Sequence, residues 1–574
     1  MAGFVLHALL NPSSEKVLPV KPAAALAAAV SLIAASAATA AESPPNVPAS
    51  PAEKTSAAAT TSPNRGVIFS PESVSSDGAV TVGGQRIDYR AVAGTIVVHP
   101  KGWDDAAHRA AAAELDDKAK DKDSDDSNPK AEASMFYVAY FKKGAPSAER
   151  PITFLYNGGP GSSTVWLHMG AWGPRRVITR DDVHTPAAPY RVVDNAYSLL
   201  DVSDLVFIDA PGTGFSRIAG KDKEKAFWGV DADGYAFSQF ILGFLSQYAR
   251  WNSPKYLFGE SYGTPRSAVV VNDLETNHDV DFNGVILLSQ ILNFDLNADD
   301  PQFNPGTDEG YIASLPTFAA TAWYHNRLPG PKPELEALLA EAKRFASGDY
   351  AAALQFGSEL PDDRRQAIAQ RMSELTGLPA SYILRADLRI NVGMFEQKLQ
   401  EAEGLTTGRL DSRFSGPAMD PLSKEAEYDP QSAAISSAYV SVFNDYVRDT
   451  LGFGKDRTYK AEISVGKEWS WDHQPPGADS ARRGIMNVMP DLASAMKYNT
   501  QLKVMLLGGY FDLATPFYEG WYEMHHLPIP ANLAGNIEYR YYPSGHMVYA
   551  NEASLQKMHE DVAGFIRRTD NLGR

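Results

Sequence analysis

The chain has 574 residues, of which 44% are hydrophobic, and a formal net charge of −17. This length is too great for one ordinary core, and the hydrophobic content is that of a globular protein. The acidic balance argues against binding to nucleic acid. The 12 histidines show no metal-ligand spacing, so neither a metal site nor a cofactor is expected.

The N-terminal 40 residues have the pattern of an export signal. Lys16 and Lys21 precede an Ala-rich apolar run at 23–35, and residues 38–40 read Ala-Thr-Ala, a typical cleavage site. We therefore predict a signal peptide at residues 1–40 and an exported protein, periplasmic or secreted. Alanine is too weakly apolar for a stable membrane span, although an uncleaved signal would tether the protein to a membrane.

The next segments differ sharply in composition. Residues 41–65 are rich in Pro, Ala, Ser and Thr and predict a disordered linker. Residues 79–82 and 85–89 flank a Gly-Gly pair and predict a hairpin, and residues 95–99 predict a further strand. Alternating Asp and Lys at 104–133 predict a charged, solvated loop.

Apolar segments with strand character then alternate with helical patterns. They lie at residues 151–156, 204–209, 255–258, 284–289, 502–507 and 537–542. Aromatic and aliphatic residues recur at helical spacing between Phe237 and Tyr248, which predicts a helix packed on a sheet. The alternation predicts the α/β class, with a mostly parallel twisted sheet flanked by helices.

The alternation stops between residues 297 and 491, where helical patterns dominate. One apolar stripe covers residues 335–345 and another covers residues 368–375. We predict a largely helical cap at 297–491, inserted between a first part of the sheet domain at 66–296 and a second part at 492–574.

Residues 259–263 read GESYG and fit the motif GxSxG. In this motif the glycines let a strand turn sharply into a helix, with the serine, here Ser261, held up at the turn. The flanking residues agree, because 255–258 is a short apolar strand and Pro265 opens a helical pattern. Ser261 is therefore a candidate nucleophile, although an ordinary glycine-rich turn would explain the five residues alone.

A nucleophilic serine needs a base, and the base needs a carboxylate to orient it. A predicted buried strand at 504–510 ends in a loop that carries Asp512, and the strand at 537–542 leads into His546. The chain order Ser261, Asp512, His546 is that of α/β-hydrolases. The long first gap requires an inserted domain.

The strand at 151–156 runs into a glycine loop, NGGPG, at residues 157–161. Glycines let backbone amides face a ligand, and acyl transfer needs two amides directed at the developing oxyanion. The N–H groups of Gly159 and Tyr262 are the candidates. A phosphate-binding loop is the rival interpretation, but GxxxxGK[ST] is absent there and the net charge disfavours a nucleotide.

Together these motifs resemble the serine carboxypeptidases, peptidase family S10, of α/β-hydrolase fold. The matching segments lie between about residues 150 and 565 and read NGGPGSS at 157–163, DAPGTGFS at 209–216, GESYG at 259–263, GYFDLATP at 509–516 and SGHM at 544–547. The resemblance implies a triad of Ser261, Asp512 and His546, with Gly159 and Tyr262 as the oxyanion hole. The absence of cysteine fits a bacterial-type member rather than a disulfide-stabilised one.

The resemblance also implies a recognition device for the free carboxylate at the C-terminus of a substrate. Its positions correspond here to Asn157, Gly158 and Glu260, with Ala171 where the family has a second Glu. Ala171 departs from the pattern because alanine cannot hydrogen-bond a carboxyl group. Two carboxyl groups that share one proton attract each other, so binding is expected to favour acidic pH. The alternative is that Glu260 only braces the turn.

These residues predict a serine-type carboxypeptidase that acts on the C-termini of peptides or proteins through an acyl-enzyme on Ser261. His546 would act as base and then as acid, and Asp512 would orient it. An esterase, an acyltransferase or another serine exopeptidase on the same triad is the nearest alternative, because one fold hosts many chemistries. A catalytically silent binding protein is a third hypothesis.

Overall fold

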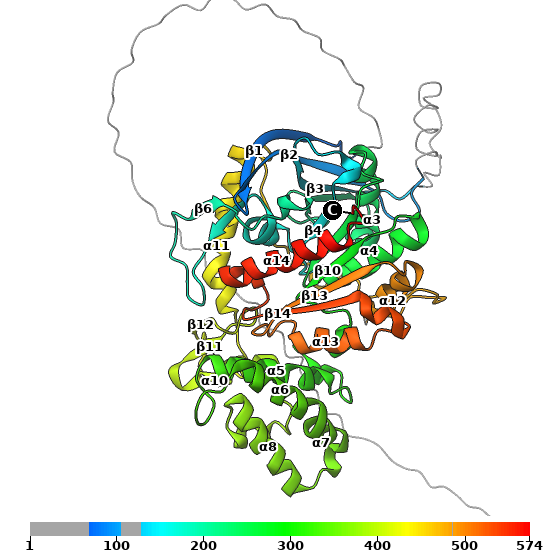
Figure 1. Ribbon diagram of the computed structural model, residues 1–574. Coiled ribbons are helices and arrows are strands. Elements are labelled where there is room, and N and C mark those ends of the chain that lie inside the picture. Colours follow the sequence, from blue (N-terminus) through cyan, green and yellow to red (C-terminus); the bar gives the residue numbers. More distant parts are fainter. Residues whose placement is uncertain (1–67, 105–127, 485, 574) are drawn as a thin grey trace, which may run out of the picture. The chain divides into compact units, whose positions relative to one another are not determined.

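The computed structural model describes residues 68–104, 128–484 and 486–573, which belong to one compact unit spanning residues 64–574 (Figure 1). The predicted signal peptide at 1–40, the predicted linker at 41–65 and most of the predicted charged loop at 104–133 lie outside the described residues. Among the described helices, none has the length and hydropathy needed to cross a membrane.

Three antiparallel strands begin the sheet: β1 (Ser73–Val82), β2 (Gln85–Val98) and β3 (Ala131–Lys142). The β1–β2 turn is the predicted Gly-Gly pair, and both glycines have positive φ, as a tight hairpin requires. The separate strand predicted at 95–99 is wrong. Residues 89–98 pair with β3 without a break, so this segment is the second half of β2.

A parallel array follows and contains all six predicted strands, so the predicted fold class is confirmed. β3 pairs antiparallel with β7, and the order then runs β7-β4-β9-β10-β13-β14 with every neighbour parallel. Their bounds are Ile152–Tyr156 for β4, Asp204–Ile208 for β7, Lys255–Glu260 for β9, Gly284–Leu288 for β10, Lys503–Gly509 for β13 and Ile537–Tyr542 for β14. This is an α/β-hydrolase sheet, and its loops at the strand ends can share one site.

Helices cover both faces of the sheet (Figure 1). On one face, α3 (Val230–Gln247), α4 (Gly263–His278) and α12 (Met489–Tyr498) share an apolar core with alternate strand residues. On the other face, α14 (Glu552–Thr569) packs against the remaining strand residues. Because successive side chains of a strand point to opposite faces, an apolar strand such as β9 contributes to both cores.

The residues between β10 and β13 divide into two parts. The first, α5 to α10, has an apolar core largely of its own. The second contains α11 (Pro430–Asp445), whose apolar side chains join the core on the face of the sheet that α14 covers. The helices of the first part are α5 (Glu309–Tyr324), α6 (Leu335–Phe345), α7 (Ala351–Phe356), α8 (Asp362–Thr376), α9 (Ala380–Arg385) and α10 (Val392–Leu399).

The remaining elements are short. They are β5 (Arg175–Ile178), β6 (Arg191–Asp194), β8 (Arg217–Gly220), β11 (Leu405–Thr407), β12 (Ser415–Pro417), α2 (Lys223–Phe227) and α13 (Phe517–His525). β8 extends the large sheet by pairing with β3, whereas β5–β6 and β11–β12 are separate two-stranded ribbons.

Candidate active site

Ser261 occupies the sharp turn between β9 and α4, as the GxSxG motif predicts. Its φ of 59° lies in the left-handed region, which is strained for a residue with a side chain. The backbone amide of Ser261 donates to the carbonyl of Leu288 at 2.9 Å and so fixes the turn to the end of β10. A Cβ on Gly259 would clash with the carbonyl of Gly263, which explains the glycine at that position.

Asp512 and His546 lie in the loops that follow β13 and β14. Nδ1 of His546 and Oδ2 of Asp512 are 2.8 Å apart. The buried carboxylate also accepts from the amides of Ala514 and Thr515 at 2.9 and 3.0 Å, and from the Thr515 hydroxyl at 2.7 Å. These donors fix the orientation of the carboxylate, which in turn fixes the imidazole ring.

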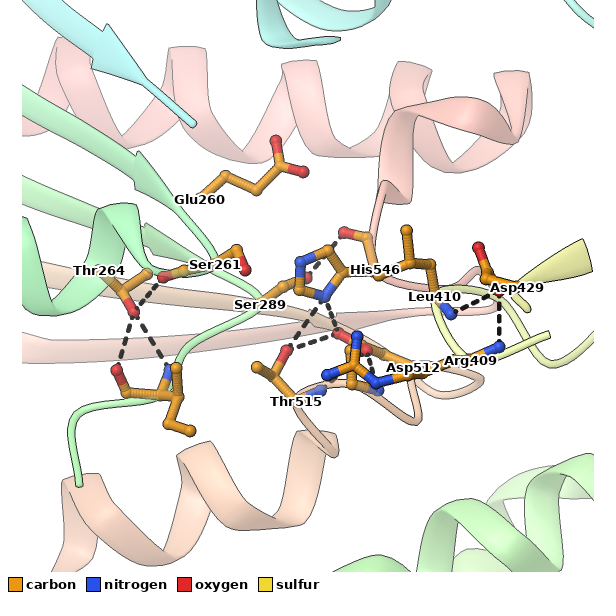
Figure 2. Close-up of polar contacts among 12 residues, drawn as sticks. Glu260, Ser261, Thr264, Ser289, Arg409, Leu410, Asp429, Asp512, Thr515 and His546 are labelled. Carbon is orange, nitrogen blue, oxygen red and sulfur yellow. Dashed lines mark hydrogen bonds and ion pairs between the residues drawn. The ribbon is translucent and has the colours of Figure 1, made fainter. Parts of the chain in front are cut away.

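Figure 2 shows the side chain of Ser261 beside the imidazole of His546, with Asp512 at the far side of the ring. Because Nδ1 is bonded to Asp512, Nε2 is the nitrogen left for the serine. In the described part of the chain no hydrogen bond joins the side chains of Ser261 and His546. Ser289 Oγ, just after β10, donates to the carbonyl of His546 at 2.7 Å and ties the end of β10 to the loop of His546. Apo enzymes often show a long serine–histidine contact.

The charged groups around His546 favour its protonated form. Burial acts to lower its pKa, but the charge and hydrogen bond of Asp512 and the charge of Glu260 outweigh burial and raise the pKa above its ordinary value. A histidine of raised pKa is a stronger base toward a serine hydroxyl.

The two predicted oxyanion donors sit on adjoining loops. A Cβ on Gly158 would clash with the amide nitrogen of Tyr262, so the glycine loop and the start of α4 are in direct backbone contact. Within the described residues, neither the amide of Gly159 nor that of Tyr262 donates to a protein acceptor. Both amides are therefore available to a ligand atom.

Asn157 and Glu260 meet at the same junction. Asn157 Nδ2 donates to Glu260 Oε2 at 2.8 Å, and the Tyr549 hydroxyl donates to the same carboxyl group at 2.9 and 3.1 Å. Burial raises the pKa of Glu260 to about 7, although the charge of His546 and the hydrogen bonds from Tyr549 and Asn157 act to lower it. Glu260 is therefore neutral below about pH 7 and can donate a hydrogen bond.

The motif DAPGTGFS supports the glycine loop rather than the chemistry. Asp209 Oδ1 accepts from the amide and the hydroxyl of Thr164 at 2.9 and 2.8 Å. Gly214 lies so close to this carboxylate that a Cβ there would overlap it. The Asp209 carboxylate thus anchors the residues that follow NGGPG.

The segment that follows β11 supports the loops that carry Asp512 and His546. The amide of His546 donates to the carbonyl of Leu410 at 2.6 Å, and the amide of Leu513 donates to the carbonyl of Arg409 at 3.0 Å. Asp429, at the start of α11, accepts from the amides of Arg409 and Leu410 (Figure 2). The residues between β10 and β13 therefore form part of the support for Asp512 and His546.

The structure thus brings all eight predicted site residues to one end of the parallel strands. Sequence reasoning missed two contributors, Thr515 and Tyr549. Thr515 lies within the segment GYFDLATP, three positions after Asp512, so the motif could have indicated it. Tyr549 belongs to no motif that we recognised. No cluster of His, Asp and Glu that could hold a metal ion occurs in the described ranges.

Comparison with known proteins agrees with the motifs. A family model described as serine carboxypeptidase matches residues 126–297. The chain is 31% identical over 135 residues to a carboxypeptidase Y homolog of Arthroderma benhamiae, a match covering 23% of this chain and 24% of that protein. It is 27% identical over 177 residues to serine carboxypeptidase-like 36 of Arabidopsis thaliana, covering 29% and 34%. The chain is therefore similar to serine carboxypeptidases over part of its length.

These matches span about a quarter to a third of the length of the two relatives. Among solved structures, the proline iminopeptidase of Mycobacterium smegmatis aligns with 76% of this chain and 96% of its own, at 12% identity and a TM-score of 0.33.

Proposed function

We propose that the protein is a serine-type carboxypeptidase that releases residues from the C-termini of peptides or proteins. One observation carries this proposal: a buried carboxyl group, Glu260, lies next to Ser261 in the chain and is bonded to Asn157 of the glycine loop. A triad alone supports many acyl transfers. A neutral carboxyl group beside the nucleophile is suited to bind another carboxyl group.

The geometry of the site supports the following reaction. Nε2 of His546 takes the proton of Ser261 as the serine oxygen attacks the last peptide carbonyl, and Asp512 stabilises the imidazolium that forms. The amides of Gly159 and Tyr262 bind the oxyanion. The imidazolium then protonates the leaving amino acid, and water activated by His546 hydrolyses the acyl-enzyme.

Recognition of the substrate is proposed to depend on pH. Glu260 donates a hydrogen bond to a C-terminal carboxylate only while it is protonated, and an ionised Glu260 repels that carboxylate. Since its pKa is about 7, affinity for the C-terminus is favoured at acidic pH. Asn157 and the backbone at Gly158 are the other proposed contacts.

The test is to incubate the protein with a peptide mixture and with the same peptides carrying a C-terminal amide, and to follow both by mass spectrometry. We expect stepwise loss of C-terminal residues from the free acids and little loss from the amides. Equal trimming of both sets would favour another serine exopeptidase. Because Ala171 removes one family contact, an esterase or acyltransferase is the second candidate, and intact peptides with rapid ester hydrolysis would favour it.

Location and domain organisation are further proposals. The export signal predicted at residues 1–40 is tested by N-terminal sequencing of the mature protein, which we expect to begin near residue 41. Residues 66–296 and 492–574 are proposed as the two parts of the hydrolase domain, and residues 297–491 as an insert that shapes the substrate site.

A further inference from the structure

The ring of Tyr549 packs against Gly170, a residue without a side chain. Gly170 precedes Ala171, the position at which the acidic residue of the family pattern is missing. A Cβ on Gly170 would lie 2.6 Å from Cδ2 of Tyr549 and 2.8 Å from Cε1 of Tyr439. Because both distances are shorter than side-chain carbons allow, only glycine leaves room for the Tyr549 ring here.

The hydroxyl of Tyr549 is shared unevenly by the two oxygens of Glu260. Oε2 accepts from Asn157 at 2.8 Å and from Tyr549 at 2.9 Å, which uses both of its lone-pair positions. Among the described residues, Oε1 has only the longer contact with Tyr549, at 3.1 Å. A proton on the neutral carboxyl group is therefore best placed on Oε1.

We infer that Tyr549 is a positioning residue for recognition of the substrate's C-terminal carboxylate. Its phenol holds Glu260 so that Oε1 carries the proton and donates a hydrogen bond to that carboxylate. In this chain a phenol supplies the support that a second carboxyl group would supply at position 171. The inference rests on the proposed function and adds to it the group that fixes Glu260.

A phenol differs from a carboxyl group in how it titrates. The groups that face Glu260 are His546, Asp512, Tyr439, Tyr549 and the neutral amide of Asn157. Burial and the charge of Glu260 raise the pKa of Tyr549 well above its ordinary value, so the phenol stays protonated. On the protein side, recognition then depends on one titrating carboxyl group, Glu260, and not on two coupled ones.

The experiment is Tyr549→Phe, which keeps the ring in its packed position and removes only the hydroxyl. Two substrates are compared: an N-acylated Phe-Leu dipeptide with a free C-terminus, and p-nitrophenyl acetate, which has no terminal carboxylate. At mildly acidic pH we expect KM for the dipeptide to rise about tenfold and kcat to change by less than about threefold, because one hydrogen bond to a buried carboxyl group is lost. Ester turnover should fall far less than kcat/KM for the dipeptide.

The pH profile supplies a second readout. The hydrogen bond from Tyr549 lowers the pKa of Glu260, so its loss should move the pH at which KM for the dipeptide begins to rise to a higher value. Tyr439→Phe is the matched control, because Tyr439 belongs to the same aromatic group but makes no hydrogen bond to Glu260 in the described structure. It should retain the wild-type KM and pH profile.

An unchanged dipeptide KM in Tyr549→Phe, or a parallel fall in dipeptide and ester turnover, overturns the role of Tyr549. A wild-type protein that cleaves the dipeptide and its C-terminal amide equally well indicates instead that the proposed carboxypeptidase function is wrong. The two failures are therefore distinguishable.

Discussion

Two buried histidines of this protein bond to aspartates, but they differ in how many ring nitrogens are occupied. His473 uses both: Nδ1 is 2.6 Å from Asp231 and Nε2 is 2.8 Å from Asp491. Within the described residues, His546 is bonded through Nδ1 alone, at 2.8 Å from Asp512, and its other nitrogen faces Ser261 (Figure 2). An imidazole with both nitrogens occupied holds structure together, whereas one with a free nitrogen can move a proton.

The charges of the two histidines follow from the same contacts. Burial acts to lower the pKa of His473, but the hydrogen bonds and charges of Asp231 and Asp491 raise it to about 9, so the ring is positive at neutral pH. It joins the loop before α12 to α3 and to α12 itself. A hydrogen bond between a histidine and a carboxylate is therefore not by itself evidence that the histidine is catalytic. The position after a parallel strand, facing a strained serine, is what distinguishes His546.

The largest expected effect is loss of the nucleophile. Ser261→Ala should lower kcat by about 10⁶-fold, because no other group in the site can form the acyl-enzyme. Thermal unfolding should be essentially unchanged, and labelling by a fluorophosphonate probe should disappear. Activity close to that of the wild type would refute the assignment of Ser261.

Asp512→Asn tests whether the aspartate, rather than the imidazole alone, makes His546 reactive. We expect kcat to fall about 10⁴-fold, because an amide no longer fixes the tautomer that leaves Nε2 free for the serine. Steady-state kinetics with an ester and a peptide provide the measurement. A decrease of less than about tenfold would mean that Asp512 only braces its loop.

Glu260→Gln separates recognition from acid–base chemistry. The wild-type KM for a free C-terminus should rise about fivefold from about pH 7 to about pH 8, as Glu260 loses its proton. A glutamine keeps a donor but cannot ionise, so KM should vary by less than about twofold over that range. A wild-type KM that does not change with pH would contradict the role given to Glu260.

The smallest expected effect is on stability, at the other histidine. His473→Gln should retain activity and lower the free energy of unfolding by about 2 kcal/mol at about pH 6, because a buried charged contact is lost. A folded-state pKa of about 9 exceeds the ordinary 6.5, so this stabilisation is complete below about pH 6.5 and is lost as pH rises through 9.

Urea unfolding of the wild type and the variant at both ends of that range gives the difference directly. His525→Gln, at an exposed position on α13, is the control and should match the wild type at every pH. A stability difference that stays constant from about pH 6 to about pH 9 would show that His473 is not charged in the folded state.

Much of this arrangement could be predicted from the sequence, because parallel strands buried on both faces are continuous apolar runs. Ser261 and Asp512 each follow such a run, whereas His546 follows β14, a half-buried strand at the end of the sheet that also contains Glu538 and Arg540. The ends of parallel strands converge, so the three residues are brought together. The long β2 was predicted as two strands because Gly94 interrupts its pattern. Pairing with β1 up to Gly94 and with β3 on both sides of it keeps the strand continuous.

The contacts that hold the site residues in place could not be predicted from the sequence in the same way. Tyr549 and Glu260 are far apart in the chain, and their contact depends on the space left at Gly170. Likewise, the apolar stripe of α11 has the same period whether the helix packs on other helices or beneath a sheet. The period of the apolar residues shows which face of a helix is buried, but not which element packs against that face.

The carbonyls of Arg409 and Leu410 limit how the stretch between β10 and β13 can be exchanged. They come from the stretch between β10 and β13, yet they hold the main chain of the loops that carry Asp512 and His546. A chimera that takes this stretch from a relative must therefore reproduce these two acceptors. Without them, the loops of Asp512 and His546 would each lose a main-chain hydrogen bond that fixes their position.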